Sequence, residues 1–384
     1  MNSIGLNILL ICKTLPWQFK GGIQTHTWQL AKALNDKGHQ VSILSGGAFR
    51  SYEKRVIKEG IEVISRPYFP GRYIKPISFL AEEFAFNWAA KNWVEENHEA
   101  FDIIHSQGRS GYLLFLVKAV HHKLINTVHG LIDLENQERP WYAFNRNLHT
   151  SITKWIEKKL LFASRINISV SKSLKDQVQT LRLNTPLEVI SNGVSAQHIS
   201  KQTSTNKSAK FLFIGRLHPV KGVSRIVEKM AMASEDITLD IIGTGHEFER
   251  ISEAIRKNGL KNKVRLLGEF TNEEIHKVIP DYNALILPSH YETQGIVLLE
   301  ANAHAIPVIA SDIPAIRETV TDRFNGILCN ADDPMEFINA MDYMSKNAAI
   351  AEQMGRNGQE KVLKQYTWSQ IAEDTLQAYY KIAV

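Results

Sequence analysis

The chain has 384 residues, of which 44% are hydrophobic, and this composition excludes a disordered or collagen-like protein and favours two globular domains. No apolar run reaches the roughly 18 residues of a membrane-spanning helix, and the start lacks the basic segment and cleavage site of a signal peptide. We therefore expect a cytoplasmic protein. The net charge of +5 is uneven, because residues 1–195 carry 24 Lys and Arg against 16 Asp and Glu, and the rest carry 21 against 24. The basic first half favours an anionic partner, such as a phospholipid surface, a lipid-linked phosphate or nucleic acid.

Short apolar strands alternate with helices in the first half. A strand is predicted at residues 8–11, followed by a loop with Gly21-Gly22 and a helix that carries Trp28, Ala31 and Leu34 at helical spacing. Buried strands separated by helices are typical of a parallel, doubly wound sheet. Further strands are predicted at residues 39–44, 61–65, 102–105, 124–128, 165–170 and 187–190.

A polar segment divides the chain. Residues 196–209 (AQHISKQTSTNKSA) lack hydrophobic periodicity and predict a linker or loop. The alternation then restarts, with strands predicted at residues 211–214, 239–242, 264–267, 284–287 and 308–310. The sequence thus predicts an α/β protein with two Rossmann-like, doubly wound domains that face a cleft. Ligands of such sheets bind beyond the carboxyl ends of the strands, so we expect the chemistry in those loops.

Two cations follow the first strand of the second half. In the segment FLFIGRLHPVKG (211–222), Gly215 allows a turn at the strand end, and Arg216 and Lys221 project from the loop before a helix expected near Val223. An arginine can bind a phosphate with two N–H groups and a lysine acts as a point charge, so this pair favours a phosphate clamp. The alternative is a solvated loop with two ordinary surface cations.

Two carboxylates lie eight residues apart in the segment 288–307 (PSHYETQGIVLLEANAHAIP). Glu292 and Gly295 precede an apolar helix, and Glu300 lies about one turn inside it. Sugar hydroxyls can donate the hydrogen bonds that a buried carboxylate needs, and free amides near Gly295 and Ile296 favour a phosphate. The alternative is helix capping by Glu292 and an ion pair in the core for Glu300.

Two weaker signals lie in the first half. Gly21-Gly22 precedes a helix, where a backbone without side chains can approach an anion closely. His129 stands at the carboxyl end of the strand predicted at 124–128. The alternative for Gly21-Gly22 is a turn that binds nothing, and the alternative for His129 is a purely structural role. The G-x-G-x-x-G fingerprint is missing and no acidic residue ends the second strand, so a dehydrogenase is poorly supported.

Taken together, the motifs resemble the retaining glycosyltransferases of family 4, which have the GT-B fold. The resemblance covers nearly the whole chain, and it implies domains at residues 1–195 (acceptor side) and 196–367 (donor side), with a C-terminal helix at 368–384 that packs back on the first domain. The segments that carry it, in order, are GGIQTH, TVHG, VISNGV, GRLHPVKG, IIGTG, the E-x7-E segment ending in PVIAS, and YTWSQIAEDTLQAYY.

The resemblance implies a role for each site residue in the second half. Arg216 and Lys221 would hold the donor diphosphate and stabilise the departing nucleotide. Glu300 would bind the ribose hydroxyls. Glu292 would contact hydroxyls of the donor sugar, together with the backbone amides of Gln294, Gly295 and Ile296.

In the first half, Gly22 would offer its backbone N–H to the distal phosphate, and His129 would lie near the anomeric carbon. The resemblance thus implies that Arg216, Lys221, Glu292 and His129 act in catalysis. Similar enzymes need no metal, and no D-x-D pair appears among these motifs. We therefore expect no metal and no cofactor besides the donor, since two cations and helix termini can meet a diphosphate.

We expect transfer of a hexose from a nucleotide-diphosphate sugar to an acceptor hydroxyl with retention, in the synthesis of cell-surface polysaccharide, lipopolysaccharide or glycolipid. A UDP-sugar is favoured over GDP-mannose as donor, and a sugar or a lipid-linked molecule is the expected acceptor. The alternatives are a GT-B nucleotide-sugar epimerase and a non-catalytic GT-B binding subunit. No recognised motif supports nucleic-acid binding.

Four departures from the family pattern leave the donor sugar open; two are Ser195, where Asp commonly follows N-G-V, and the loop 313–318, which is often Gly-Gly before an acidic residue, and the other two lie in the segment 288–307. The usual E-x-F-G segment reads Glu292-Thr-Gln-Gly295 here, so that a polar amide occupies an apolar position. The glycine that usually precedes the proline motif is Ala305. None of these departures removes a charged group from the predicted site.

An amphipathic segment at 151–165 (SITKWIEKKLLFASR) predicts contact with a membrane. We expect it to lie peripherally on the anionic inner face of a bilayer, where a lipid-linked acceptor can be reached. The alternative is an apolar face packed on the sheet. The predicted apolar face holds Ile152, Trp155, Ile156 and Ala163, with Lys154, Lys158, Lys159 and Arg165 beside it and Trp141, Tyr142 and Arg146 before it.

Overall fold

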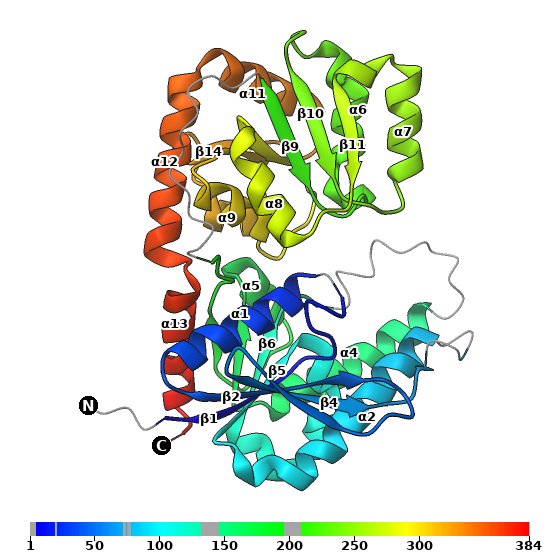
Figure 1. Cartoon of the computed structure of the whole chain (residues 1–384), viewed down its shortest axis with the longest axis vertical. Helices are drawn as coiled ribbons and strands as arrows, with labels where there is room; N and C mark the ends of the chain where they lie inside the picture. The colour runs from blue at the N-terminus through cyan, green and yellow to red at the C-terminus, as the bar shows by residue number, and fades with distance from the viewer. Residues whose placement is uncertain are drawn as a thin grey trace. The chain divides into compact units, whose positions relative to one another are not determined.

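The computed structural model describes residues 5–19, 21–71, 74, 78–131, 146–195 and 209–383. These residues form two compact units (Figure 1). Unit 1 comprises Met1–Asn192 together with Trp368–Val384, and unit 2 comprises Gly193–Thr367. The predicted linker lies outside the described residues, except for its last residue, Ala209.

Eight strands among the described residues form the sheet of unit 1, in the order β3-β4-β2-β1-β5-β6-β7-β8. Every pair is parallel except β3 with β4, so the predicted doubly wound α/β sheet is confirmed. The strands are β1 (Asn7–Ile11), β2 (Gln40–Gly47), β3 (Lys54–Lys58), β4 (Ile61–Pro67), β5 (Ile103–Gln107), β6 (Leu124–Val128), β7 (Ile166–Ser169) and β8 (Leu187–Val189).

The edge strand β3 was not predicted. Its residues, KRVIK, are all exposed, so the strand lacks the alternation of a half-buried strand and carries three charges of the kind that protects sheet edges. Both residues of the turn to β4 have positive φ, 50° at Glu59 and 80° at Gly60. These values match the tight turns that join antiparallel strands.

Helices cover both faces of the unit 1 sheet. Ile8 and Leu10 of β1 pack in one apolar cluster with α1 and α13, and Leu9 and Ile11 pack in another with α2 and α4. Figure 1 shows α13 beside α1, so the end of the chain completes the core of unit 1. The helices are α1 (Gly22–Asp36), α2 (Ser78–Asn97), α4 (Arg146–Ala163), α5 (Lys172–Gln179) and α13 (Trp368–Tyr380), with short 3₁₀ turns η2 (His98–Ala100), η3 (Gly108–Leu116) and η4 (Lys118–Lys123).

The predicted apolar face of α4 is divided. Ile156 is buried and Ile152 partly buried, both packed on the core of unit 1, whereas Trp155 is 56% exposed. Expecting all of these residues on one face was therefore wrong, because a 100° step separates Trp155 from Ile156. Trp141 and Tyr142 lie outside the described residues, as does the side chain of Arg146.

Six parallel strands among the described residues form the sheet of unit 2, in the order β11-β10-β9-β12-β13-β14. β14, with the sequence GILC, was not predicted. The strands are β9 (Lys210–Ile214), β10 (Thr238–Ile242), β11 (Val264–Gly268), β12 (Ala284–Leu287), β13 (Val308–Ser311) and β14 (Gly326–Cys329).

The helices of unit 2 bury one apolar cluster against this sheet. Among the described helices of the whole chain, none has both the length and the apolar character needed to cross a bilayer. The helices of unit 2 are α6 (Val223–Lys229), α7 (Phe248–Lys257), α8 (Asn272–Val278), α9 (Ile296–Ala303), α10 (Pro314–Thr319), α11 (Pro334–Lys346) and α12 (Ala348–Gln365), with η6 (Pro219–Lys221), η7 (Met230–Met232), η8 (Leu260–Asn262) and η9 (Ile279–Asp281).

Candidate functional site

The loop beyond β9 presents the two predicted cations. The strand ends at Ile214, Arg216 is exposed, and Lys221 ends η6 before α6 begins at Val223, the predicted position. Among the described residues, no ion pair is formed by Arg216. Its guanidinium is therefore available to an anion.

Close backbone contacts fix this loop against its neighbours. A Cβ at Gly222 (φ 68°) would overlap the carbonyl oxygen of Pro288 in the loop beyond β12. A Cβ at Gly243, in the IIGTG segment beyond β10, would overlap the carbonyl oxygen of Gly215. The backbone N–H of Leu217 also donates to the carbonyl oxygen of Thr244 over 2.8 Å. These glycines allow three loops on adjacent strands to pack as one wall.

Lys221 and Glu292 form an ion pair across two of these loops. Nζ of Lys221 lies 2.6 Å from Oε1 of Glu292, and the hydroxyl of Ser289 donates to the same oxygen over 2.8 Å. The side chains of Lys221 and Glu292 are only 19% and 10% exposed. The charge of Lys221 is thus partly balanced, whereas no described residue balances that of Arg216. The motifs gave no sign of this pair.

The carboxylate of Glu300 lies one turn inside α9. This helix begins at Ile296 with Gly295 as its N-cap (φ 76°), so Glu292 does not cap it. Among the described residues, no hydrogen bond or ion pair is formed by Glu300, which overturns the alternative of an ion pair in the core. Burial raises the pKa of Glu300 to about 7. The carboxylate can therefore accept hydrogen bonds from a ligand.

Three other predicted positions surround the start of α9. Gln294 is 2% exposed, Gly295 is buried and Ile296 is partly buried. The departure at Ala305 has a visible consequence, because Ala305 adopts φ 55°, in the left-handed region that favours glycine. Ala305 therefore adopts a backbone conformation that a glycine would adopt more easily.

In unit 1, the pair Gly21-Gly22 stands at the start of α1. Gly22 is exposed, and its N-cap Gly21 supplies no side-chain hydrogen bond to the first turn. One turn later, the buried ring of His26 donates from Nδ1 to Oδ1 of Asn192 over 2.7 Å. Two of the quoted segments, GGIQTH and VISNGV, therefore meet through these side chains, which are 166 residues apart.

His129 belongs to a buried polar network at the carboxyl ends of β5 and β6. Its Nε2 donates to Oε1 of Gln107 over 3.0 Å, and Nε2 of Gln107 donates to Nε2 of His105 over 3.3 Å. Nδ1 of His105 lies 2.6 Å from the hydroxyl of Tyr379 on α13. The ring of His129 also meets that of His26 edge-on at 4.8 Å.

The three histidines of this network are neutral at physiological pH. Burial lowers the pKa of His26 to about 4 and that of His105 to about 3. Burial, followed by repulsion from these two rings, lowers the pKa of His129 well below its usual range. His129 can therefore accept or donate hydrogen bonds but offers no positive charge to a ligand.

The structure gathers the predicted residues into two sets. In unit 2, the loops beyond β9 and β12 and the start of α9 carry Arg216, Lys221, Glu292 and Glu300. In unit 1, Gly22 and His129 follow β1 and β6 at the carboxyl edge of that sheet. Among the described residues, no cluster of three or more His, Cys, Asp or Glu side chains could hold a metal ion. Sequence reasoning missed His26, Gln107, Asn192 and Ser289, of which only Gln107 lies outside the quoted segments.

Two family models match the two halves of the chain. The model described as Glycosyltransferase Family 4 matches residues 20–198, and the model described as Glycosyl transferases group 1 matches residues 195–361. The chain belongs to glycosyltransferase family 4. The predicted family, the GT-B fold and the class of retaining glycosyltransferases are confirmed.

Full-length relatives agree with this assignment. An uncharacterized glycosyltransferase of Methanocaldococcus jannaschii is 27% identical over 97% of this chain and 98% of its own. Sucrose-phosphate synthase from Thermosynechococcus elongatus has a similar structure, with a TM-score of 0.81 at 21% identity over 98% of this chain and 99% of its own. Anabaena HepE, solved in complex with UDP-glucose, has a TM-score of 0.73 at 17% identity over 97% and 100% of the two chains. At these identities the solved structures establish the fold alone.

Proposed function

We propose that this family 4 glycosyltransferase moves a hexose from a UDP-sugar to an acceptor hydroxyl, with retention at the anomeric carbon and without a metal ion. One observation carries the proposal: Arg216, which is exposed and forms no ion pair with any described residue, lies in the same wall of loops as the Lys221–Glu292 pair. This arrangement offers charge to a diphosphate and a carboxylate to a sugar at adjacent strand ends.

The chemistry needs both kinds of group. As the bond between the anomeric carbon and the phosphate oxygen breaks, positive charge grows on the sugar and negative charge grows on the distal phosphate. Cations held at that phosphate stabilise the late charge more than the ground state, and this difference accelerates transfer. Arg216 and Lys221 supply these cations, and the backbone N–H of Gly22 supplies a further donor. Glu300 accepts hydrogen bonds from the ribose.

Retention follows when the acceptor attacks from the face that the phosphate leaves. The phosphate oxygen then takes the proton of the acceptor hydroxyl. Glu292 is held by Lys221 and Ser289, which favours binding of sugar hydroxyls over nucleophilic attack. A neutral His129 contributes hydrogen bonds near the anomeric carbon and no charge.

UDP is the nucleotide that the comparisons favour. Anabaena HepE, which shares the fold over nearly the whole chain, binds UDP-glucose in its crystal structure. GDP-mannose is the second candidate for the donor.

We infer from the surface of α4 that the acceptor is a lipid-linked molecule at an anionic membrane. The reaction would then belong to the synthesis of cell-surface polysaccharide, lipopolysaccharide or glycolipid. On α4, Trp155 and Phe162 are 56% and 39% exposed. Nζ of Lys159 lies 5.6 Å from the ring of Trp155, and Nζ of Lys158 lies 5.7 Å from that of Phe162. Exposed aromatic rings beside lysines are typical of a surface that rests on anionic headgroups.

A panel of nucleotide sugars tests the proposal. Purified protein is incubated with UDP-hexoses and GDP-mannose in excess EDTA, with and without acceptor glycans and lipids, and products are identified by mass spectrometry and by the NMR coupling of the anomeric proton. We expect glycoside formation from a UDP-hexose that persists in the chelator. Conversion of the donor to its epimer without an acceptor would support the epimerase instead, and strict dependence on magnesium or manganese would contradict the metal-free site.

A further inference from the structure

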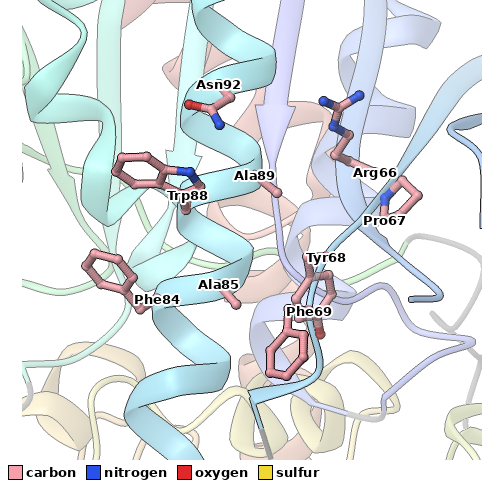
Figure 2. A pocket seen from close by; sticks show the side chains of 9 residues that line it. All are labelled: Arg66, Pro67, Tyr68, Phe69, Phe84, Ala85, Trp88, Ala89 and Asn92. Carbon is pink, nitrogen blue, oxygen red and sulfur yellow. The ribbon is translucent and has the colours of Figure 1, made fainter. Parts of the chain in front are cut away.

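A groove of about 540 Å³ lies in unit 1 between α2 and the chain that leaves β4 (Figure 2). Its volume falls within the roughly 300–1,000 Å³ of small-ligand sites. Tyr68 and Phe69 line one wall, and Phe84 and Trp88 of α2 line the other. None of these residues belongs to the donor site proposed above.

The sequence of α2 explains why the groove is open. Ala85 and Ala89 lie one helical turn apart and face the chain after β4, so their small side chains leave a trough (Figure 2). Phe84 and Trp88, also one turn apart, have rings inclined by only 17° with centroids 6.2 Å apart. Both side chains are about half exposed, at 47% and 48%. They form an apolar ledge on α2, with Nζ of Lys91 lying 5.3 Å from the centre of the Trp88 ring.

The opposite wall is held in place. The hydroxyl of Tyr68 donates to Oε1 of Glu82 on α2 over 2.7 Å, and its ring meets Phe86 edge-on at 5.5 Å. Phe69 meets Phe49 edge-on at 5.3 Å. A site held in this way loses little conformational freedom when a ligand binds.

The groove has one apolar and one polar end. Figure 2 shows Phe84 and Phe69 at one end and the side chains of Asn92 and Arg66 at the other. Nη1 of Arg66 also lies 3.2 Å from Oε2 of Glu53, which leaves further N–H groups of the guanidinium for a ligand. A purely apolar chain would displace water from those N–H groups without replacing its hydrogen bonds.

The groove begins at the edge of the sheet that carries His129. Pro67 ends β4, and His129 follows the end of β6, so both lie at the carboxyl edge of this parallel sheet. Lys13 follows β1 at the same edge, and its Nζ lies 3.6 Å from Oε1 of Glu83 on α2. A molecule in the groove can therefore extend along one face of unit 1 toward the sheet edge where His129 lies.

We propose that this groove binds the acceptor as a saccharide, with one pyranose ring on the ledge of Phe84 and Trp88 and its hydroxyl or carboxylate groups at Arg66 and Asn92. The C–H face of a sugar ring packs on the negative face of an aromatic ring, and its polar edge takes the hydrogen bonds. The assignment rests on the proposed function, since it names the acceptor of that reaction.

An array of printed oligosaccharides provides the first test. We expect the wild-type protein to bind a subset of the glycans, and Phe84→Ala and Trp88→Ala to lose that binding while their melting temperatures stay within about 2 °C, since both rings are half exposed. The matched control is Tyr52→Ala, because Tyr52 is an aromatic side chain of unit 1 that is 91% exposed. No binding by the wild-type protein, or equal binding by the variants, would overturn the proposal.

Kinetics with a bound glycan as acceptor provide the second test. Loss of the stacking ring in Trp88→Ala should raise the acceptor KM about 10-fold, whereas Trp88→Phe should recover most of it. The Kd for UDP-glucose, measured by calorimetry, should not change. If Trp88→Ala instead loses flotation with anionic vesicles and keeps glycan binding, the ledge is a membrane surface and the proposal fails. Glycan binding without any donor turnover would refute the proposed function, and the groove would then be a saccharide site that does not serve as the acceptor site.

Discussion

Arg216 and Lys221 lie on one loop but differ in their surroundings, and this difference separates the effects of their removal. Arg216 is exposed and forms no ion pair with the described residues, so Arg216→Ala removes charge without removing packing. We expect kcat to fall by about 10²-fold, the usual cost of one preorganised donor, with an unchanged melting temperature. The control is Lys261→Ala, which removes an exposed cation before the amino end of β11. Wild-type turnover by Arg216→Ala would end the assignment of a diphosphate clamp.

Lys221→Ala should lower both turnover and stability. It leaves the mostly buried carboxylate of Glu292 without its cation, and an unpaired buried charge destabilises a fold. Lys221→Arg should restore the melting temperature more than kcat, because a guanidinium fork does not place charge where a lysine does. Steady-state kinetics beside melting curves measure both effects. Equal recovery of both quantities would contradict a role of Lys221 at the phosphate.

Glu300 should make the stability of unit 2 depend on pH. Burial raises its pKa from 4.5 to about 7, so at intermediate pH the folded protein keeps a proton that the unfolded chain releases. The resulting stabilisation is complete below about pH 4.5 and is lost as the pH rises to about 7. Glu300→Gln, which stays neutral, should therefore melt like the wild-type protein at pH 4 and at a higher temperature at pH 8.

The same substitution should weaken donor binding at pH 8. A carboxylate accepts hydrogen bonds from ribose hydroxyls more strongly than an amide does. We expect calorimetry to show a higher Kd of Glu300→Gln for UDP-glucose at pH 8 and a smaller difference at pH 6. A variant that gains stability and keeps its affinity would place Glu300 outside the ribose site.

At the scale of the elements, α4 combines a core face with a surface face. Ile156 packs into unit 1, whereas Trp155 and Phe162 lie in solvent beside Lys158 and Lys159. We expect flotation with anionic vesicles that weakens at high salt and falls several-fold in the double variant Lys158→Glu/Lys159→Glu, as lysines near a charged surface each contribute about 1 kcal/mol. The double variant Lys54→Glu/Lys58→Glu, on the exposed strand β3, is the charge-matched control. Equal recovery with neutral and anionic vesicles would refute a headgroup contact.

At the scale of the whole molecule, unit 1 is built from both ends of the chain. Leu376 and Tyr379 of α13 are buried in one cluster with Ile8 and Trp28. Truncating a buried leucine typically costs about 2–5 kcal/mol, so Leu376→Ala should lower the melting temperature of unit 1 by several degrees or more. Calorimetry should show no such shift for Gln377→Ala, because that side chain is exposed. An unchanged transition would mean that unit 1 folds without its last helix.

Local chemistry alone determined much of this protein. Apolar runs bounded by turn residues gave most of the strands, since a buried strand leaves its pattern in consecutive residues. The order of the motifs gave the family, and the position of Glu300 in α9 followed from an eight-residue spacing. The strand β3 was missed because its residues are charged and exposed, and the short strand β14 was missed as well.

Only the tertiary structure determined which side chains that are distant in the sequence form hydrogen bonds and ion pairs with each other. Lys221 and Glu292 are 71 residues apart, and their pairing depends on β9 and β12 being neighbours in a sheet. His105 meets Tyr379 because α13 returns to unit 1. The groove beside Trp88 depends on where the chain after β4 passes α2. The packing of the whole core determines the order of the strands and the position of α13 on unit 1, and no periodicity in the sequence indicates either.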